Sequence, residues 1–222
     1  MKSFARDKIS QSLLILMFLA VISATTSFAA TYTFQQGAAA IVSGATDSGS
    51  HCDDCVTAIT LPFGYKLYGT TYTTANVGAN GNLQFGGSDT YAGSNPLPDT
   101  FHFSTPTILA LQNDLRTDQV GGGIFTSVTG ASPNRIFNIE WRAVLFSNPA
   151  LSVNFEIRLF EGLNRFEIIY GAIAVNGAQQ TVGVQKDNTD FTQFENNTAN
   201  TLFAGLQLIA TAAPTAASVS IG

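Results

Sequence analysis

The sequence predicts an all-β protein, built as an antiparallel β-sandwich or a jelly-roll-like fold. Between residues 136 and 170, three successive segments alternate apolar with polar residues. That alternation is the pattern of a strand that turns one face toward a core. Outside the first 29 residues no stretch keeps apolar residues at helical spacing, and glycine and asparagine interrupt the chain throughout. Many short strands with glycine-rich connections are typical of sandwiches and jelly rolls.

The first residues indicate a signal peptide that is not part of the fold. Three basic residues among the first eight precede an apolar run at residues 13–22. Ser27-Phe28-Ala29 then places small residues at the two positions that a signal peptidase recognises. We therefore assign residues 1–29 as signal peptide, with a retained N-terminal anchor as the alternative. The apolar run is too short to span a bilayer, and no later stretch is long and apolar enough to do so. We expect a secreted protein, extracellular or at the cell surface, without a transmembrane segment after cleavage.

Residues 30–210 are expected to form a single β-sandwich domain, and residues 211–222 a C-terminal tail or an added strand. Asn80-Gly81 tolerates positive φ at both positions, so it predicts a tight hairpin. Residues 217–221 alternate again, as a strand would. The expected strands are short segments between turn residues: Tyr32–Phe34, Ala58–Tyr68, Thr71–Val77, Asn82–Phe85, Thr107–Leu111, Gly123–Val128, the three segments between 136 and 170, Thr181–Gln185 and Leu206–Ile209.

The longest stretch without a strand pattern is residues 86–106, which contain three prolines. A loop of that length in a compact domain is either functional or crosses an end of the sandwich. Its His102, between two phenylalanines, is expected to pack at a sheet edge. Three tyrosines are the expected exposed contact residues, because a tyrosine ring has a polar tip: Tyr68, Tyr72 and Tyr91.

The charge balance restricts the partners. The chain has a net charge of −5 with ten basic residues, and loss of the leader would remove three of these. Nucleic acid and anionic membrane surfaces both need a basic footprint, so neither is expected as a partner. The expected partners are other proteins, glycans or copies of the chain itself.

The two cysteines lie together in the segment His51-Cys52-Asp53-Asp54-Cys55. In an exported chain the first interpretation is a disulfide between Cys52 and Cys55. A zinc site would need about four ligands, and this segment supplies at most three. A thioredoxin-type redox centre would need a helix after the first cysteine, which the sequence does not provide.

Four aspartates in predicted loops are candidate calcium ligands: Asp53, Asp54, Asp114 and Asp118. They lack the spacing of an EF-hand, so solvated loop acids and turn caps are the preferred interpretation. No other cofactor is expected.

Three glutamates of the alternating segments, Glu140, Glu156 and Glu167, could suggest a glycosidase pair. Each lies on the polar side of its segment, which is expected to face solvent. Each also has an arginine two positions away on the same side, so charge pairing explains them without catalysis: Arg142, Arg158 and Arg165. No nucleophile elbow, phosphate-binding loop or dinucleotide motif is present, and we expect the protein not to be an enzyme.

The order of motifs along the chain resembles a known family. The motifs are Asn80–Phe85, Ala110–Thr117, Gly123–Phe125, Phe137–Trp141, Phe155–Leu159, Phe166–Gly171 and Thr181–Val184. This succession resembles the nidogen-like (NIDO) extracellular domain and related modules of secreted bacterial proteins, over roughly residues 60–210. The resemblance implies an extracellular β-rich module of adhesion or matrix proteins, without established catalytic residues.

The sequence therefore favours a secreted, non-catalytic β-sandwich that acts by surface contact, as an adhesive or extracellular structural protein. One alternative is a self-assembling filament subunit, in which Tyr32–Phe34 or the alternating C-terminal residues pair with a sheet edge of another copy. A second alternative is a carbohydrate-active or metal-dependent hydrolase that uses the loop acids.

Overall fold

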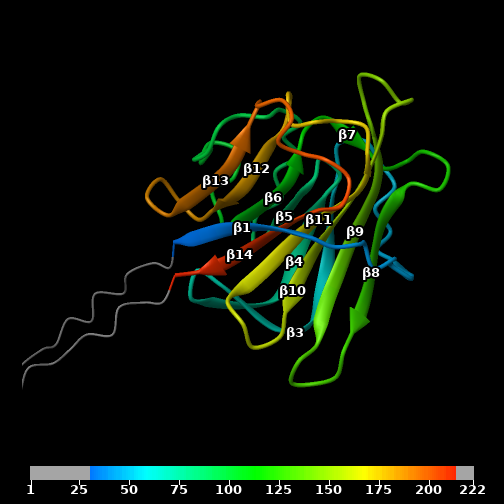
Figure 1. The fold of residues 1–222 in the computed structure, drawn as a ribbon. Coiled ribbons are helices and arrows are strands. Elements are labelled where there is room, and N and C mark those ends of the chain that lie inside the picture. The colour runs from blue at the N-terminus through cyan, green and yellow to red at the C-terminus, as the bar shows by residue number, and fades with distance from the viewer. Residues whose placement is uncertain (1–30, 214–222) are drawn as a thin grey trace, which may run out of the picture.

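The computed structural model describes residues 31–213, which form two antiparallel β-sheets packed face to face without a helix (Figure 1). The predicted all-β sandwich is confirmed. Within the described residues there is no helix that could cross a membrane. The predicted signal peptide at residues 1–29 and the alternating residues 217–221 lie outside this part of the chain.

The first sheet has the strand order β1-β14-β11-β10-β9-β8-β2, with β7 beside β9, and the second sheet has the order β13-β12-β6-β5-β4-β3. The first sheet contains β1 (Tyr32–Ala38), β2 (Thr46–Asp47), β7 (Leu115–Arg116), β8 (Gly123–Thr129), β9 (Ile136–Leu145), β10 (Ser152–Phe160), β11 (Arg165–Ile173) and β14 (Leu206–Ala212). The second contains β3 (Val56–Leu67), β4 (Thr70–Gly78), β5 (Asn82–Gln84), β6 (Thr107–Gln112), β12 (Thr181–Gln185) and β13 (Phe191–Asn196). Sequence patterns missed β2, β7 and β13, because two strands of two residues and one without regular alternation leave no clear period.

The predicted alternating segments are β9, β10 and β11, and their apolar residues lie in register. Ile139 lies opposite Ile157, which in turn lies opposite Ile168. One side of the sheet thus becomes a continuous apolar surface that packs on the second sheet. The predicted hairpin at Asn80-Gly81 is also confirmed, because these residues connect β4 to β5 and Gly81 has a φ of 82°.

Two buried aromatic side chains of the first sheet form hydrogen bonds to the backbone of the second sheet. The Trp141 ring of β9 is fully buried and its Nε1 donates a hydrogen bond of 2.9 Å to the carbonyl of Gly78. The Tyr170 hydroxyl of β11 donates one of 2.6 Å to the carbonyl of Ala110 in β6. A buried indole or phenol needs such a partner, so these bonds fix how the two sheets lie on each other.

The sequence predicted that the outer face of the first sheet is exposed to solvent. In the structure this face is covered. Residues 39–45, which we call the strap, run from β1 at one edge of the sheet to β2 at the other and cross its outer face (Figure 1). Glu156 is fully buried, and Glu140 and Glu167 are buried as well. The prediction of a wet face was therefore wrong, because alternation shows which residues share a face but not what covers it.

Part of the outer face of the second sheet is covered too, although outward residues of β3 and β4 remain exposed. Residues 86–106, which we call the long loop, lie over β5, β6 and β12 instead of crossing an end of the sandwich. Leu97 and Phe103 of this loop form a small apolar cluster with Leu109 of β6. Close packing also occurs at Gly183 of β12, where a Cβ would lie 2.7 Å from the Leu97 side chain.

The sheet edges bear on the hypothesis of strand exchange. β1 pairs with β14 of its own chain along its whole length, from Tyr32 opposite Ala212 to Ala38 opposite Leu206. β1 is also the edge strand of the first sheet, so its other side has no strand partner within residues 31–213. Its pairing with another copy stays a prediction from the sequence. β3 is an edge of the second sheet and carries Pro62 and Lys66, two residue types that hinder addition of a further strand.

Candidate functional site

The long loop is held by amide side chains that stand on the outer face of the second sheet. Gln84 of β5 accepts a hydrogen bond from the backbone of Asp89 and donates one to its carbonyl, at 2.9 and 2.7 Å. Gln112 of β6 donates to the carbonyls of Tyr91 and Gly93, at 2.7 and 3.1 Å. Further bonds to the loop backbone come from Asn76, Asn80, Thr181, Gln185, Gln193 and Asn196.

This row of amides gives the loop the backbone partners that a strand would otherwise provide. Buried peptide groups are costly unless they are hydrogen-bonded. Gln84, Gln112 and Gln185 are themselves buried to 99% or more. The loop is thus fixed by groups inside the fold, although it has no regular structure. A long loop positioned by a rigid scaffold is a common place for binding residues.

The long loop presents an aromatic side chain to solvent. Phe101 is 88% exposed, although phenylalanine is one of the residue types most often buried in folded proteins. It lies edge-on to the His102 ring at 4.8 Å, and His102 in turn stacks on Tyr91 at 3.6 Å. A hollow of about 270 Å³ lies beside it. We call Ser88, Asp89, Phe101, His102 and Ser104, which line this hollow, the Phe101 surface.

The sequence pointed to other aromatics as contact residues. Tyr68 is buried, and its hydroxyl donates a hydrogen bond to the carbonyl of Val184. The prediction that Tyr68 is an exposed contact residue was therefore wrong. Tyr72 and Tyr91 are only half-exposed. No simple sequence signal singles out Phe101, because residues two apart in an extended segment share a side and the buried Phe103 would predict a buried Phe101. Phe101 instead lies in a turn at residues 100–102 and is exposed, while Phe103 is buried.

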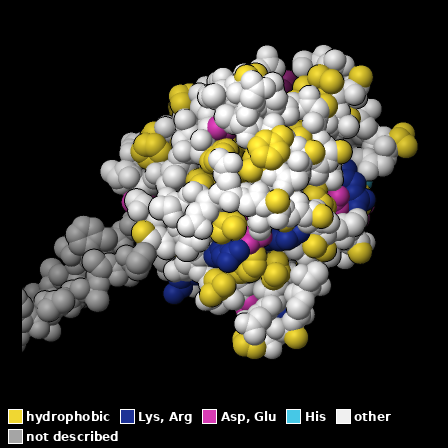
Figure 2. Space-filling view, viewed as in Figure 1, with side chains coloured by type: hydrophobic (Ala, Val, Ile, Leu, Met, Phe, Trp, Pro, Cys, Tyr) yellow, Lys and Arg dark blue, Asp and Glu magenta, His cyan; other side chains and the backbone are white. Residues whose placement is uncertain are grey.

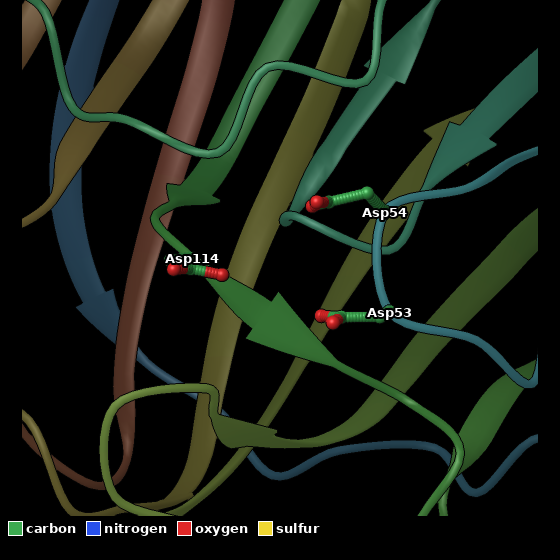
Figure 3. Close-up of side chains that lie close together, drawn as sticks. All are labelled: Asp53, Asp54 and Asp114. Carbon is green, nitrogen blue, oxygen red and sulfur yellow. The ribbon is translucent and has the colours of Figure 1, made fainter.

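Three of the four predicted calcium ligands lie together. Asp53 and Asp54 extend from the 50–55 segment toward Asp114, which directly precedes β7 (Figure 3). Carboxylate oxygens of the three lie within 4.8 Å of one another. Asp118 does not join them, because its carboxylate pairs with Arg116 at 2.7 Å. Exposed acidic groups often gather without an ion, so calcium binding stays a prediction from the sequence.

We expect Asp114→Asn to raise the thermal midpoint slightly in calcium-free buffer at neutral pH. Partial burial raises the pKa of Asp114, and the nearby charges of Asp54 and Asp53 raise it further. Removal of its charge relieves that repulsion, with an effect of about 0.5–1 kcal/mol, as is usual at such positions. Scanning calorimetry with EDTA and with millimolar calcium measures this. A calcium-dependent rise in the wild type that the variant lacks would instead make the three aspartates a cation site.

The predicted Cys52–Cys55 disulfide is present. It closes a loop that is fixed to the sandwich through Thr117, whose N–H donates to the Cys52 carbonyl at 2.7 Å. The Thr117 hydroxyl lies 3.1 Å from the Cys52 N–H. Both sulfurs are taken up in the bond, so the zinc site considered from the sequence lacks its two thiolates.

The predicted pairing of glutamates with arginines two positions away is confirmed. Arg142 pairs with Glu140 at 2.7 Å, and the same arrangement joins Arg158 to Glu156 and Arg165 to Glu167. Figure 2 shows basic and acidic side chains next to one another on this face.

The buried charges also bind the strap. Glu156 and Glu140 accept hydrogen bonds from the backbone of Val42 and Gly44, at 2.7 and 2.8 Å. Arg158 donates to the carbonyl of Ala40 at 2.6 Å. Burial raises the pKa of Glu156, although Arg158 opposes this. The arrangement explains both carboxylates as structural groups.

A further buried carboxylate has no basic partner among the described residues. Glu195 of β13 is 4% exposed, and one of its oxygens has no hydrogen-bond partner. Its other contacts are the Thr198 N–H and the Thr201 hydroxyl. Burial raises its pKa to about 7.

Glu195→Gln is therefore expected to stabilise the protein at pH 8. Because the folded-state pKa lies above the unfolded value, wild-type stability is greatest at acidic pH and is lost as the pH rises toward 7. The gain of the variant at pH 8 is at most about 3 kcal/mol, from the size of the shift, and vanishes near pH 4. Urea titrations at both pH values measure it. An equal effect of the variant at both pH values would contradict the assignment.

Comparison with known proteins gives one match. A protein family model described as NIDO related matches residues 24–220, nearly the whole chain. No curated protein and no solved structure matches the chain.

Proposed function

The chain belongs to the NIDO-related family, and we propose that it is an extracellular, non-catalytic β-sandwich protein that acts by surface contact, as an adhesive or structural component. The family indicates an extracellular type of domain. A disulfide between its only two cysteines fits an oxidising compartment, where such bonds persist. The N-terminal signal peptide predicted from the sequence would deliver the chain there.

The observation that carries the proposal is the exposed Phe101 on a loop that buried amides hold in place. Aromatic side chains dominate the energy of many interfaces. A rigid loop loses little conformational freedom on binding, so more of the contact energy remains as affinity. The protein thus places a large apolar group in solvent on an ordered support.

The state of the carboxylates supports a non-catalytic role. A glycosidase needs two carboxyl groups that face the substrate. Glu140 and Glu156 are instead buried under the strap and bonded to it. Glu167 forms an ion pair with Arg165 and accepts a hydrogen bond of 2.8 Å from the Gln207 amide.

Replacement of Phe101 tests the proposal. Fluorescently labelled protein is incubated with cells of the source organism and with the extracellular material around them, and the bound fraction is measured. We expect Phe101→Ser to reduce binding at least tenfold, which corresponds to about 1.4 kcal/mol. Val120→Ser is the matched control, because Val120 is also fully exposed but lies in another loop. We expect it to bind as the wild type does.

Both side chains are in solvent, so both variants should keep the wild-type thermal midpoint. Absence of binding by the wild type to cells and matrix alike would overturn the proposed function. Equal losses in the two variants would show that the Phe101 surface is not the contact.

A further inference from the structure

We propose that the Phe101 surface binds a neutral sugar unit of an extracellular glycan, with Phe101 against the ring and polar groups around its hydroxyls. The inference deepens the proposed function and rests on it, because it names the ligand class for the same surface. Five features carry it: the polar hollow, the aromatic neighbour, the absence of basic lining groups, the size and the fixed loop.

The hollow is lined mainly by groups that exchange hydrogen bonds with hydroxyls. Ser88 and Ser104 are exposed. Asp89 and His102 face each other with Oδ1 and Nδ1 at 3.7 Å, and their side chains remain 35% and 23% exposed. A carboxylate accepts two hydroxyl donors, and an imidazole offers one donor and one acceptor. This set suits a ligand with several adjacent hydroxyls.

The apolar side of a sugar ring needs an aromatic partner, and Phe101 is placed to supply it. Its ring is 88% exposed beside the hollow. The His102 ring, which stacks on Tyr91, packs edge-on against the Phe101 ring. A phenyl ring buries C–H groups without competing for the hydroxyls of the ligand.

Charge selects against anionic ligands. The lining residues include Asp89 but no lysine or arginine. A phosphate or a uronic acid would thus meet a carboxylate without a lysine or arginine to balance its charge. A neutral sugar meets no such penalty.

Size and rigidity fit a single sugar unit. The volume of about 270 Å³ lies just below the range of drug-sized ligand pockets, which span about 300–1,000 Å³. Asp89 is held on both sides, because its N–H donates to Gln84 and its carboxylate accepts from the N–H of Tyr91 at 2.7 Å. The loop therefore does not have to be ordered when the ligand arrives.

The experiment is a titration of the ¹⁵N-labelled mature chain, residues 30–222, followed by two-dimensional NMR. The probes are cellohexaose, maltohexaose, laminarihexaose, chitohexaose and mannohexaose, with polygalacturonate as the anionic control and spermidine as the cationic control. We expect at least one neutral hexasaccharide to shift the amide signals of residues 86–105 in a saturable way. Neither control should do so.

Three variants make the result specific. Phe101→Ala and Asp89→Asn should each weaken binding of the active probe at least tenfold, while Val120→Ala should leave it unchanged. Asp89→Asn keeps the shape of the side chain, so its effect reports hydrogen bonding.

The outcomes separate the inference from the function beneath it. Shifts with spermidine or polygalacturonate alone, or with none of the probes, would overturn the sugar assignment. If binding to cells still depends on Phe101 in that case, the proposed function stands. The ligand is then a protein if no probe binds, and a charged molecule if only a charged control binds. If cell binding is absent as well, both fail.

Discussion

Arg158→Ala is expected to lower the free energy of unfolding by about 3–5 kcal/mol, the cost of leaving a buried charge without its partner. Its partner Glu156 is fully buried in the first sheet. The substitution also removes the hydrogen bond to the carbonyl of Ala40 in the strap. Because the pKa of Glu156 is already raised by burial, loss of the arginine raises it further. Part of the cost should therefore disappear in acid, where Glu156 takes up a proton.

The strap is the element that this substitution should release. It is bound to the sheet mainly through Glu140, Arg142, Glu156 and Arg158. Once Arg158 is gone, amide hydrogen exchange should quicken in residues 39–45 more than in β9 or β10. Urea titration gives the change in stability, and exchange followed by mass spectrometry locates it.

A matched arginine provides the control. Arg135 pairs with Glu161 at 2.6 Å. This pair lies where β9 begins and β10 ends, and its hydrogen bonds do not involve the strap. The Arg135 side chain is 30% exposed, so Arg135→Ala should cost only about 1 kcal/mol or less. Equal losses in the two variants would show that the charges under the strap behave as an ordinary surface pair. In that case the strap would not depend on them.

The strap and the long loop, which lie over the outer faces of the sheets, show what the sequence could and could not predict. The alternation of Trp141, Phe155 and Ile168 with polar residues identified the core face of the first sheet, because strand parity is local. The same pattern could not tell whether Glu156 faces water or a strap that lies more than 100 residues earlier in the chain. Local patterns assign residues to a face, whereas burial of that face depends on contacts between distant segments.

The site followed the same logic. Cys52 and Cys55 could be paired from the sequence, because they are three positions apart and no other cysteine exists. The long loop could be recognised as an unusual length of chain without strand pattern. Its attachment could not, because Gln84, Gln112 and Gln185 look like ordinary solvent-facing residues of a half-buried sheet. Only the fold shows that their amides replace water as partners of the loop backbone.

Gln185→Leu should be nearly as costly as the loss of Arg158, and it tests whether the long loop is held as a unit. Gln185 is fully buried in β12 and bonds to three backbone groups of the loop. It accepts from the Asp99 N–H at 2.8 Å, and donates to the carbonyls of Asp99 and Phe103 at 3.1 and 2.7 Å. Leucine fills much of the space but leaves all three groups without partners. At about 1–3 kcal/mol for each unpaired buried group, we expect a loss of about 3 kcal/mol or more.

The consequence for function is what makes this variant informative. Phe101 lies between the two residues that Gln185 holds, Asp99 and Phe103, so their release should unfix the aromatic side chain without altering it. Binding to cells or matrix should then fall although Phe101 is intact.

The control is Gln193→Leu. It removes a single hydrogen bond of 2.8 Å, which the exposed Gln193 side chain accepts from the Leu97 N–H. It should cost less than about 1 kcal/mol and leave binding unchanged. Full binding by a folded Gln185→Leu protein would mean that contact by Phe101 does not require a rigid loop. The preorganisation argument for this surface would then fail.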